Sequence, residues 1–174
     1  PSCFFKGFAD HSPINERKLA IKGSLGDMGE NGLLINEKYG SYVFIGEIIT
    51  DAEIPKRVMN HPRICTRCGI CIDACPKKTD CLSQISQKKR KTEDDFSILF
   101  ENNIIWGCDN CQETCPLNMS ASLSPFSYFY DGKISSPISI LTMSDEEFNS
   151  YSFSYRSKSV IEENIKNIAK KDID

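Results

Sequence analysis

The stretch CTRCGICIDACP at 65–76 decides how this chain is organised. Its cysteines follow the spacing C-x2-C-x2-C-x3-C with a proline directly behind, which is typical of ligands of [4Fe–4S] clusters. One tight loop can bring three thiolates to one cube, and its backbone amides stabilise the negative charge of the sulfurs. The fourth cysteine lies beyond this loop and ligates a second cube. The stretch therefore predicts two clusters.

A second run, CDNCQETCP at 108–116, supplies three more cysteines, and Cys81 lies between the runs. These eight thiolates are enough for two four-iron clusters, and Cys3 is left over. The last cysteine of each run should cross to the other cluster. We therefore predict two interleaved ligand sets: Cys65, Cys68, Cys71 and Cys115 for the first cluster, and Cys75, Cys81, Cys108 and Cys111 for the second.

Three other uses of the cysteines compete with this interpretation. Disulfides need an oxidising compartment, and the spacing is not that of a small secreted scaffold. Zinc can use paired C-x2-C motifs, but a third cysteine at the same spacing and the prolines behind both runs do not suit a tetrahedral site. Unligated buried cysteines would not cluster in this way. The pattern favours iron–sulfur clusters and leaves zinc as the main alternative.

Composition sets outer limits on what the chain can be. With 174 residues, 40% hydrophobic and 26% charged, it has the make-up of a soluble, folded protein of one or two domains. The longest apolar stretch, 42–49, is interrupted by Gly46 and Glu47, so we expect no membrane span. A net charge of −3 argues against a general nucleic-acid-binding surface. Reduced thiolates favour the cytoplasm. Because the sequence opens Pro-Ser-Cys without a methionine, we expect a cut piece or a processed product.

Three segments follow from the pattern along the chain. Residues 1–62 read as a partial α/β segment, 63–118 as the two-cluster module, and 119–174 as an irregular wrap followed by C-terminal helices. In the first segment, Ser12 and Pro13 predict the start of a helix that ends before Gly23. Strands are expected at 33–35 and 42–45, around a turn at 36–40.

Further helices are predicted in the other two segments. Thr92 begins a capping-box-like start, with apolar residues at helical spacing behind it. Ser144 should cap a short helix. The last helix should present Val160, Ile161, Ile165 and Ile168 on one face.

Five stretches, in this order, carry a resemblance to a known family. They are FADHSPINERKLA at 8–20, GSLGDMGENGLLINEKYGSYVFIGEIITD at 23–51, CLSQISQKK at 81–89, IWGCDNCQETCPLN at 105–118 and SYRSKSVIEENIKNIA at 154–169. Together with the first cysteine run, they make the chain resemble the central part of the epoxyqueuosine reductases, cobalamin-dependent enzymes that complete the queuosine base in tRNA. The family's N-terminal half of the cobalamin domain and its C-terminal helical repeats have no counterpart in these stretches.

The resemblance implies a fold and a set of site residues. The fold class would be α+β, with a partial α/β segment of the reductive-dehalogenase-like kind followed by a bacterial 2[4Fe–4S] ferredoxin-like module. Asp10 would be the catalytic proton donor. The residues placed toward cobalamin would be Gly26, Gly29, Gly46 and Lys89, with Lys89 also near tRNA. From the residues alone, Asp10 could equally be a cap or turn residue, and the run 88–91 a solvated face.

Two functions follow as hypotheses. In the first, the chain is the electron-transfer part of an epoxyqueuosine-reductase-like oxidoreductase, fed by a small redox carrier protein. Catalysis would then need the missing N-terminal half, present in the same polypeptide or supplied by a partner. In the second, the chain is a stand-alone ferredoxin-like carrier or partner subunit without its own catalysis. In a third possibility, the chain is an interaction protein in which the clusters have only a structural role.

Overall fold

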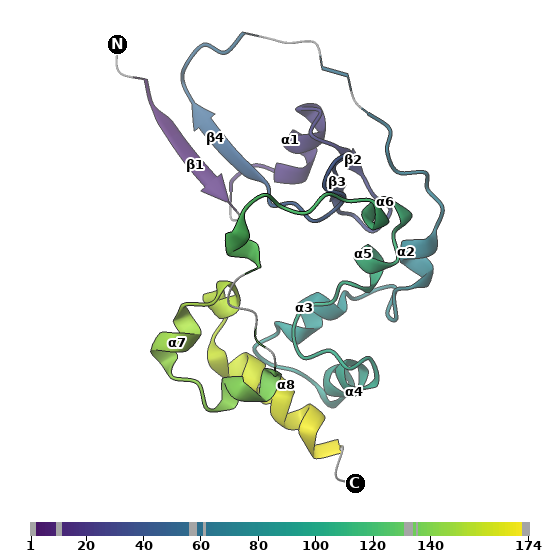
Figure 1. Cartoon of the computed structure of the whole chain (residues 1–174), viewed down its shortest axis with the longest axis vertical. Helices are drawn as coiled ribbons and strands as arrows, with labels where there is room; N and C mark the ends of the chain where they lie inside the picture. The colour runs from purple at the N-terminus through teal and green to yellow at the C-terminus, as the bar shows by residue number, and fades with distance from the viewer. Residues whose placement is uncertain are drawn as a thin grey trace. The chain divides into compact units, whose positions relative to one another are not determined.

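The computed structural model describes residues 3–9, 12–55, 59–60, 62–130, 134 and 136–171. It combines α and β structure and divides into two compact units (Figure 1). Unit 1 contains Pro1–Ala74 and Cys111–Ser124, and unit 2 contains Cys75–Asn110 and Pro125–Asp174. The chain therefore passes from one unit to the other within each of the two cysteine runs.

Unit 1 contains two small antiparallel sheets. Strand β1 (Phe5–Ala9) pairs with β4 (Gly46–Thr50), with Phe8 opposite Glu47 and Ala9 opposite Gly46. Strand β2 (Asp27–Met28) pairs with β3 (Leu34–Ile35). The helices of this unit are α1 (Glu16–Lys22), α2 (Ile70–Asp73) and α6 (Pro116–Met119), and α5 (Asn110–Glu113) begins at the last residue of a unit 2 segment.

Two predictions for this unit were wrong in detail. The first helix begins at Glu16, because Asn15, and not Ser12, is its N-cap and accepts a hydrogen bond from the Lys18 N–H at 3.0 Å. The Ser12 hydroxyl instead accepts the Ile14 N–H in a local turn. The expected strand at 42–45 is not a strand, since the pairing partner of β1 begins at Gly46.

Unit 2 is helical. Its elements are α3 (Leu82–Ser86), α4 (Glu93–Glu101), η1 (Ser127–Phe129), η2 (Pro137–Leu141), α7 (Asp145–Asn149), η3 (Ser152–Tyr155) and α8 (Lys158–Lys171). The predicted caps are confirmed. Thr92 and Asp95 form a complete capping box on α4, and the Ser144 hydroxyl accepts the Glu147 N–H on α7.

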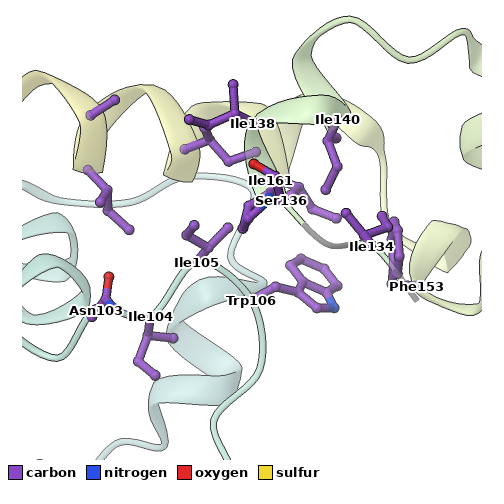
Figure 2. A pocket seen from close by; sticks show the side chains of 14 residues that line it. Asn103, Ile104, Ile105, Trp106, Ile134, Ser136, Ile138, Ile140, Phe153 and Ile161 are labelled. Atoms are coloured by element: carbon purple, nitrogen blue, oxygen red, sulfur yellow. The ribbon is translucent and has the colours of Figure 1, made fainter.

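An apolar cavity of about 560 Å³ lies within unit 2. Figure 2 shows isoleucines from several segments around it, with Trp106, Ile134 and Phe153 gathered at one end. Among the described residues of its lining, Asn103, Ser136 and the indole N–H of Trp106 are the polar side-chain groups. Because ligand sites usually combine an apolar lining with several convergent polar groups, this cavity has the character of packing space.

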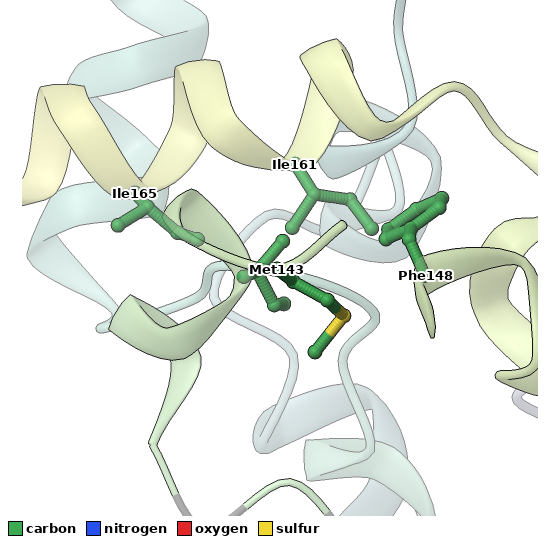
Figure 3. Packing of buried hydrophobic residues seen from close by; sticks show 5 residues of the cluster. Met143, Phe148, Ile161 and Ile165 are labelled. Carbon is green, nitrogen blue, oxygen red and sulfur yellow. The ribbon is translucent and has the colours of Figure 1, made fainter. Parts of the chain in front are cut away.

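The apolar face of α8 organises the core of unit 2. Ile161 and Ile165 pack with Ile140, Met143 and Phe148, as Figure 3 shows. A second cluster, Leu82, Ile85 and Leu99, joins α3 to α4. Both clusters are almost fully shielded from solvent, so burial of apolar surface stabilises this unit.

Unit 1 has much less of such a core. Apart from Cys115, its buried hydrophobic residues are Ala20, Leu34 and Ile35. Phe5 in β1 is 75% exposed and Phe44 before β4 is 88% exposed. Among the described residues, none of the helices combines the length and the apolar content that a membrane span requires.

Candidate iron–sulfur centre

Four cysteines of unit 1 surround one cavity of about 80 Å³. We call these four the first thiol set; they are Cys65, Cys68, Cys71 and Cys115. Cys115 comes from the second cysteine run and is only 8% exposed. Cys115 thus lines the same cavity as the three cysteines of the first run, and its role as a ligand of the first cluster stays a prediction.

The loop that carries three of these thiols is shaped by left-handed backbone positions. Arg67 has φ of +57° and Gly69 has φ of +79°. Such positions turn successive N–H groups toward the concave side of a loop, which is how backbone nests bind anions and iron–sulfur sites. Gly69 adopts this conformation without strain, whereas Arg67 adopts it at some energetic cost. Gly69 then begins α2, accepting the Ile72 and Asp73 N–H groups.

Two carboxylates of the β2–β3 hairpin hold this loop. Asp27 Oδ2 accepts the N–H groups of Ile64 and Cys65, both at 3.0 Å. Glu30 Oε2 accepts the N–H of Gly69 at 2.9 Å. Burial by itself would raise the pKa of Asp27, but the hydrogen bonds from Cys65 and Ile64 outweigh it and hold that pKa below its usual value. Asp27 is therefore held ionised at the start of the cysteine run.

The electrostatics around Cys71 favour the neutral form of its thiol. Burial raises the pKa of the Cys71 thiol, and the nearby Glu30 carboxylate and Cys115 raise it further. A metal ligand must be a thiolate, so binding of iron would release protons and would be coupled to pH.

The first thiol set fits a four-iron cube in donor type, number and space. A cavity needs roughly 10–15 Å³ to admit one water molecule, so about 80 Å³ leaves room for a group of several atoms. A single tetrahedral zinc ion draws its thiolates to within about 4 Å of one another, given Zn–S bonds of about 2.3 Å. No set of three or more His, Cys, Asp or Glu side chains within the described ranges is placed to hold one metal ion.

Three cysteines of unit 2 also lie near one another, and we call them the second thiol set: Cys75, Cys81 and Cys108. Burial raises the pKa of the Cys108 thiol, and the charges of Cys81, Asp109 and Cys75 raise it further, which shows their proximity. Cys111, the fourth predicted ligand of this cluster, belongs to unit 1. Its placement against the other three stays a prediction.

A buried polar network positions the second thiol set. Cys81 is the N-cap of α3, whose last residue, Ser86, is fully buried. The Ser86 hydroxyl accepts the N–H of Gly107, the residue before Cys108, at 3.1 Å. From α8, the Asn164 side-chain amide donates to the carbonyl oxygens of Ser86 and Ile105, both at 2.8 Å. Asn164 thereby ties together the two segments that carry Cys81 and Cys108.

The predicted catalytic and cofactor residues have mixed positions. Asp10 lies outside the described residues. A Cβ atom at Gly26 would come within 2.3 Å of the Ile35 carbonyl oxygen, and one at Gly29 within 2.5 Å of Asn31 Oδ1, so both glycines are needed for the β2–β3 hairpin itself. Gly46 begins β4, and a Cβ atom at this position would lie 3.9 Å from the Phe8 carbonyl oxygen. Lys89 lies in unit 2 beside Glu162, Glu163 and Lys166 of α8. The roles of Gly26, Gly29, Gly46 and Lys89 toward cobalamin stay predictions.

Glu47 is an unexpected feature of the β1–β4 sheet. Both of its carboxylate oxygens are shielded from solvent and have no hydrogen-bond partner in the described part of the chain. It lies opposite Phe8, two residues before Asp10 in sequence. Buried polar groups without partners are rare in folded proteins and often mark functional positions.

Three residues that support the thiols were not predicted from the sequence. Asp27 and Glu30 act across long sequence separations, which spacing alone does not reveal. Asn164 did leave a signal, since it is a polar residue within the apolar face formed by Val160, Ile161, Ile165 and Ile168. A polar side chain on a buried helix face usually has a specific hydrogen-bonding partner.

Comparisons with known proteins agree on one family. No protein-family model matches the chain. The epoxyqueuosine reductase of Cyclobacterium marinum is 35% identical over 122 residues, covering 64% of this chain and 39% of that protein. The epoxyqueuosine reductase of Shewanella oneidensis is 31% identical over 158 residues, covering 83% of this chain and 40% of that protein.

Solved structures extend this similarity over nearly the whole chain. The epoxyqueuosine reductase from Streptococcus thermophilus matches with a TM-score of 0.76 at 26% identity, covering 95% of this chain and 48% of that protein. An epoxyqueuosine reductase solved with an epoxyqueuosine-modified tRNA-Tyr stem loop matches in fold, with a TM-score of 0.69 at 24% identity and the same coverage. This chain spans less than half the length of each of these relatives. These matches show that the chain is similar, over most of its own length, to part of the epoxyqueuosine reductases.

Proposed function

We propose that this chain binds two [4Fe–4S] clusters and serves as the electron-transfer part of an epoxyqueuosine-reductase-like oxidoreductase. The observation that supports it most is the cavity in unit 1, lined by four cysteines from two distant runs. The first thiol set would hold one cluster. Cys75, Cys81 and Cys108, together with Cys111, would hold the other. Clusters of this kind take up and release single electrons, so the chain would accept them from a small redox carrier protein.

Cobalamin and tRNA complete the proposal. Cobalamin, when bound, would supply the cobalt chemistry that reduces the epoxide. This chain's proposed residues for cobalamin are Gly26, Gly29, Gly46 and Lys89, and Asp10 is the proposed proton donor. The solved relative that contains an epoxyqueuosine-modified tRNA stem loop supports tRNA as the substrate class. The β1–β4 region exposes apolar residues such as Phe5 and Phe44. Their exposure supports the proposal that a cofactor or a further protein segment binds over them.

Iron and acid-labile sulfide content tests the first part of this proposal. Anaerobically purified protein should contain about eight iron and eight sulfide atoms per chain. The Cys115→Ser variant should lose about half of the iron, because it removes one ligand of the first thiol set. Cys3→Ser, which changes a cysteine outside both sets, should keep all of it. Wild-type protein that contains zinc, or no metal, would overturn the proposal.

A second candidate function is a stand-alone ferredoxin-like carrier. Titration of the iron-loaded protein with cob(II)alamin separates the two: a spectral change that saturates supports the reductase, and an unchanged spectrum supports the carrier. If dithionite does not reduce the clusters reversibly, their role is structural and not electron transfer.

A further inference from the structure

We propose that Glu30 sets the reduction potential of the cluster at the first thiol set and holds it below the value that the cysteine loop alone would give. The inference rests on the proposed function, because it concerns one of the two proposed clusters. It assigns a role to a side chain of the β2–β3 hairpin, which is not part of the ligand motif.

The first step of the argument is the position of Glu30. Its side chain lines the same cavity as Cys65, Cys68, Cys71 and Cys115. Gly29 and Gly32 shape the turn that carries it, with the Gly32 N–H donating to the Gly29 carbonyl oxygen at 3.0 Å. The hairpin therefore presents one carboxylate directly at the wall of the thiol cavity.

The second step is the hydrogen bond that Glu30 accepts. Its partner, the Gly69 N–H, belongs to the loop between Cys68 and Cys71. Backbone N–H groups of such loops commonly point at cluster sulfurs and make reduction easier. Here the Gly69 N–H donates to the Glu30 carboxylate at 2.9 Å and therefore points at Glu30.

The third step is charge. Reduction adds one electron from an external donor, such as dithionite, and makes the cluster more negative by one unit. A carboxylate at the cavity wall disfavours this added charge through Coulomb repulsion, although exposure of Glu30 to solvent weakens the effect. Loss of a donor and gain of a negative charge act in the same direction, and both lower the potential.

Asp27 does not play the same part. It accepts the Ile64 and Cys65 N–H groups at the beginning of the run, and Arg67 lies close enough to lower its pKa by charge attraction. Its negative charge is therefore partly balanced within the loop. Asp27 is a positioning residue for Cys65, whereas Glu30 lines the thiol cavity itself.

The test is a redox titration of the iron-loaded, full-length protein, followed by EPR spectroscopy. Glu30→Gln removes the charge but keeps an oxygen that can accept the Gly69 N–H. We expect one of the two cluster signals to move to a more positive midpoint potential while the other stays in place, with iron content unchanged. Glu30→Ala also frees the amide and should shift the same signal further. Glu37→Gln removes the same charge from an exposed position just beyond β3 and should leave both signals where they are.

The outcomes separate the two proposals. Preparations without iron would refute the proposed function. Full iron content with unchanged midpoint potentials in Glu30→Gln and Glu30→Ala would refute the role of Glu30 alone. A shift of both signals by the same amount, or an equal shift in Glu37→Gln, would also refute it, because the effect would then be one of overall charge.

Discussion

The two thiol sets are held by different kinds of chemistry. In unit 1, the carboxylates of Asp27 and Glu30 hold the cysteine-bearing segment by its N–H groups. In unit 2, the neutral side chains of Ser86 and Asn164 hold the segments next to Cys81 and Cys108 from within a packed core. Unit 2 thus has a hydrophobic core of its own, whereas the cysteine loop of unit 1 depends on polar contacts and on what binds in the cavity.

Phe148→Ala should have the largest effect on stability and tests whether unit 2 depends on its hydrophobic core. Phe148 is 3% exposed in the core of unit 2, and removing its ring should cost roughly 3–5 kcal/mol of unfolding free energy. The matched change in unit 1, Phe5→Ala, affects a side chain that is 75% exposed and should cost less than about 0.5 kcal/mol. Urea unfolding followed by the fluorescence of Trp106, the single tryptophan, measures unit 2 directly. Equal losses in the two variants would break the comparison.

Asn164→Leu should have the next largest effect. Asn164 is 1% exposed, and the substitution leaves the carbonyl oxygens of Ser86 and Ile105 without their donor. Unsatisfied buried acceptors should destabilise unit 2 by about 2–4 kcal/mol, again measured through Trp106. Asn167→Leu is the control on the same helix, because its amide donates only to the local Glu163 carbonyl oxygen at 2.8 Å. Similar unfolding curves for both variants would show that Asn164 does not hold these segments together.

The smallest effect concerns acid stability and the start of α4. Burial alone would raise the pKa of Asp95, but hydrogen bonds from Lys88 and from the Thr92 N–H hold it below its usual value of 3.8. Because the pKa is lower in the folded state, the ionised carboxylate stabilises unit 2 above about pH 4, and this contribution is lost as the pH falls through the folded pKa. Asp95→Asn should therefore flatten the loss of stability in this acid range.

The change should be on the order of 1 kcal/mol or less, because the Lys88 side chain is partly exposed and its ion pair is screened by solvent. Unfolding midpoints measured between pH 2 and pH 7 provide the check. Asp94→Asn, at an exposed position in the same helical turn, should keep the wild-type slope. If Asp95→Asn also keeps the wild-type slope, the capping carboxylate contributes nothing to acid stability.

Cys115 was assigned to the first thiol set from the ligand pattern of two-cluster ferredoxins. Spacing alone grouped Cys65, Cys68 and Cys71, because the ligands within one loop lie at short local distances in the chain. Helix caps at Thr92 and Ser144 were predicted for the same reason. The start of α1 was mispredicted because two capping residues, Ser12 and Asn15, compete within four positions and only one can begin the helix.

The supporting carboxylates are a different case. Asp27 and Cys65 are 38 residues apart, and Glu30 and Gly69 are 39 residues apart, so only the folded hairpin brings these pairs together. The pairing of the strands was missed for a related reason: β4 lies opposite β1, more than thirty residues earlier in the chain, and not opposite its near neighbour β3. Long-range pairing depends on tertiary packing, which local propensity does not encode.

The contribution of Cys115 to the first thiol set has a consequence for biosynthesis. Cys115 is the 44th residue that the ribosome adds after Cys71. Translation proceeds at roughly 5–20 residues per second, so for about 2–9 s the nascent chain contains only three of the four thiols of this set. Cofactor delivery to the first thiol set would therefore be post-translational or late co-translational. A message truncated before the codon for Cys115 would yield a product that lacks the fourth thiol of this set.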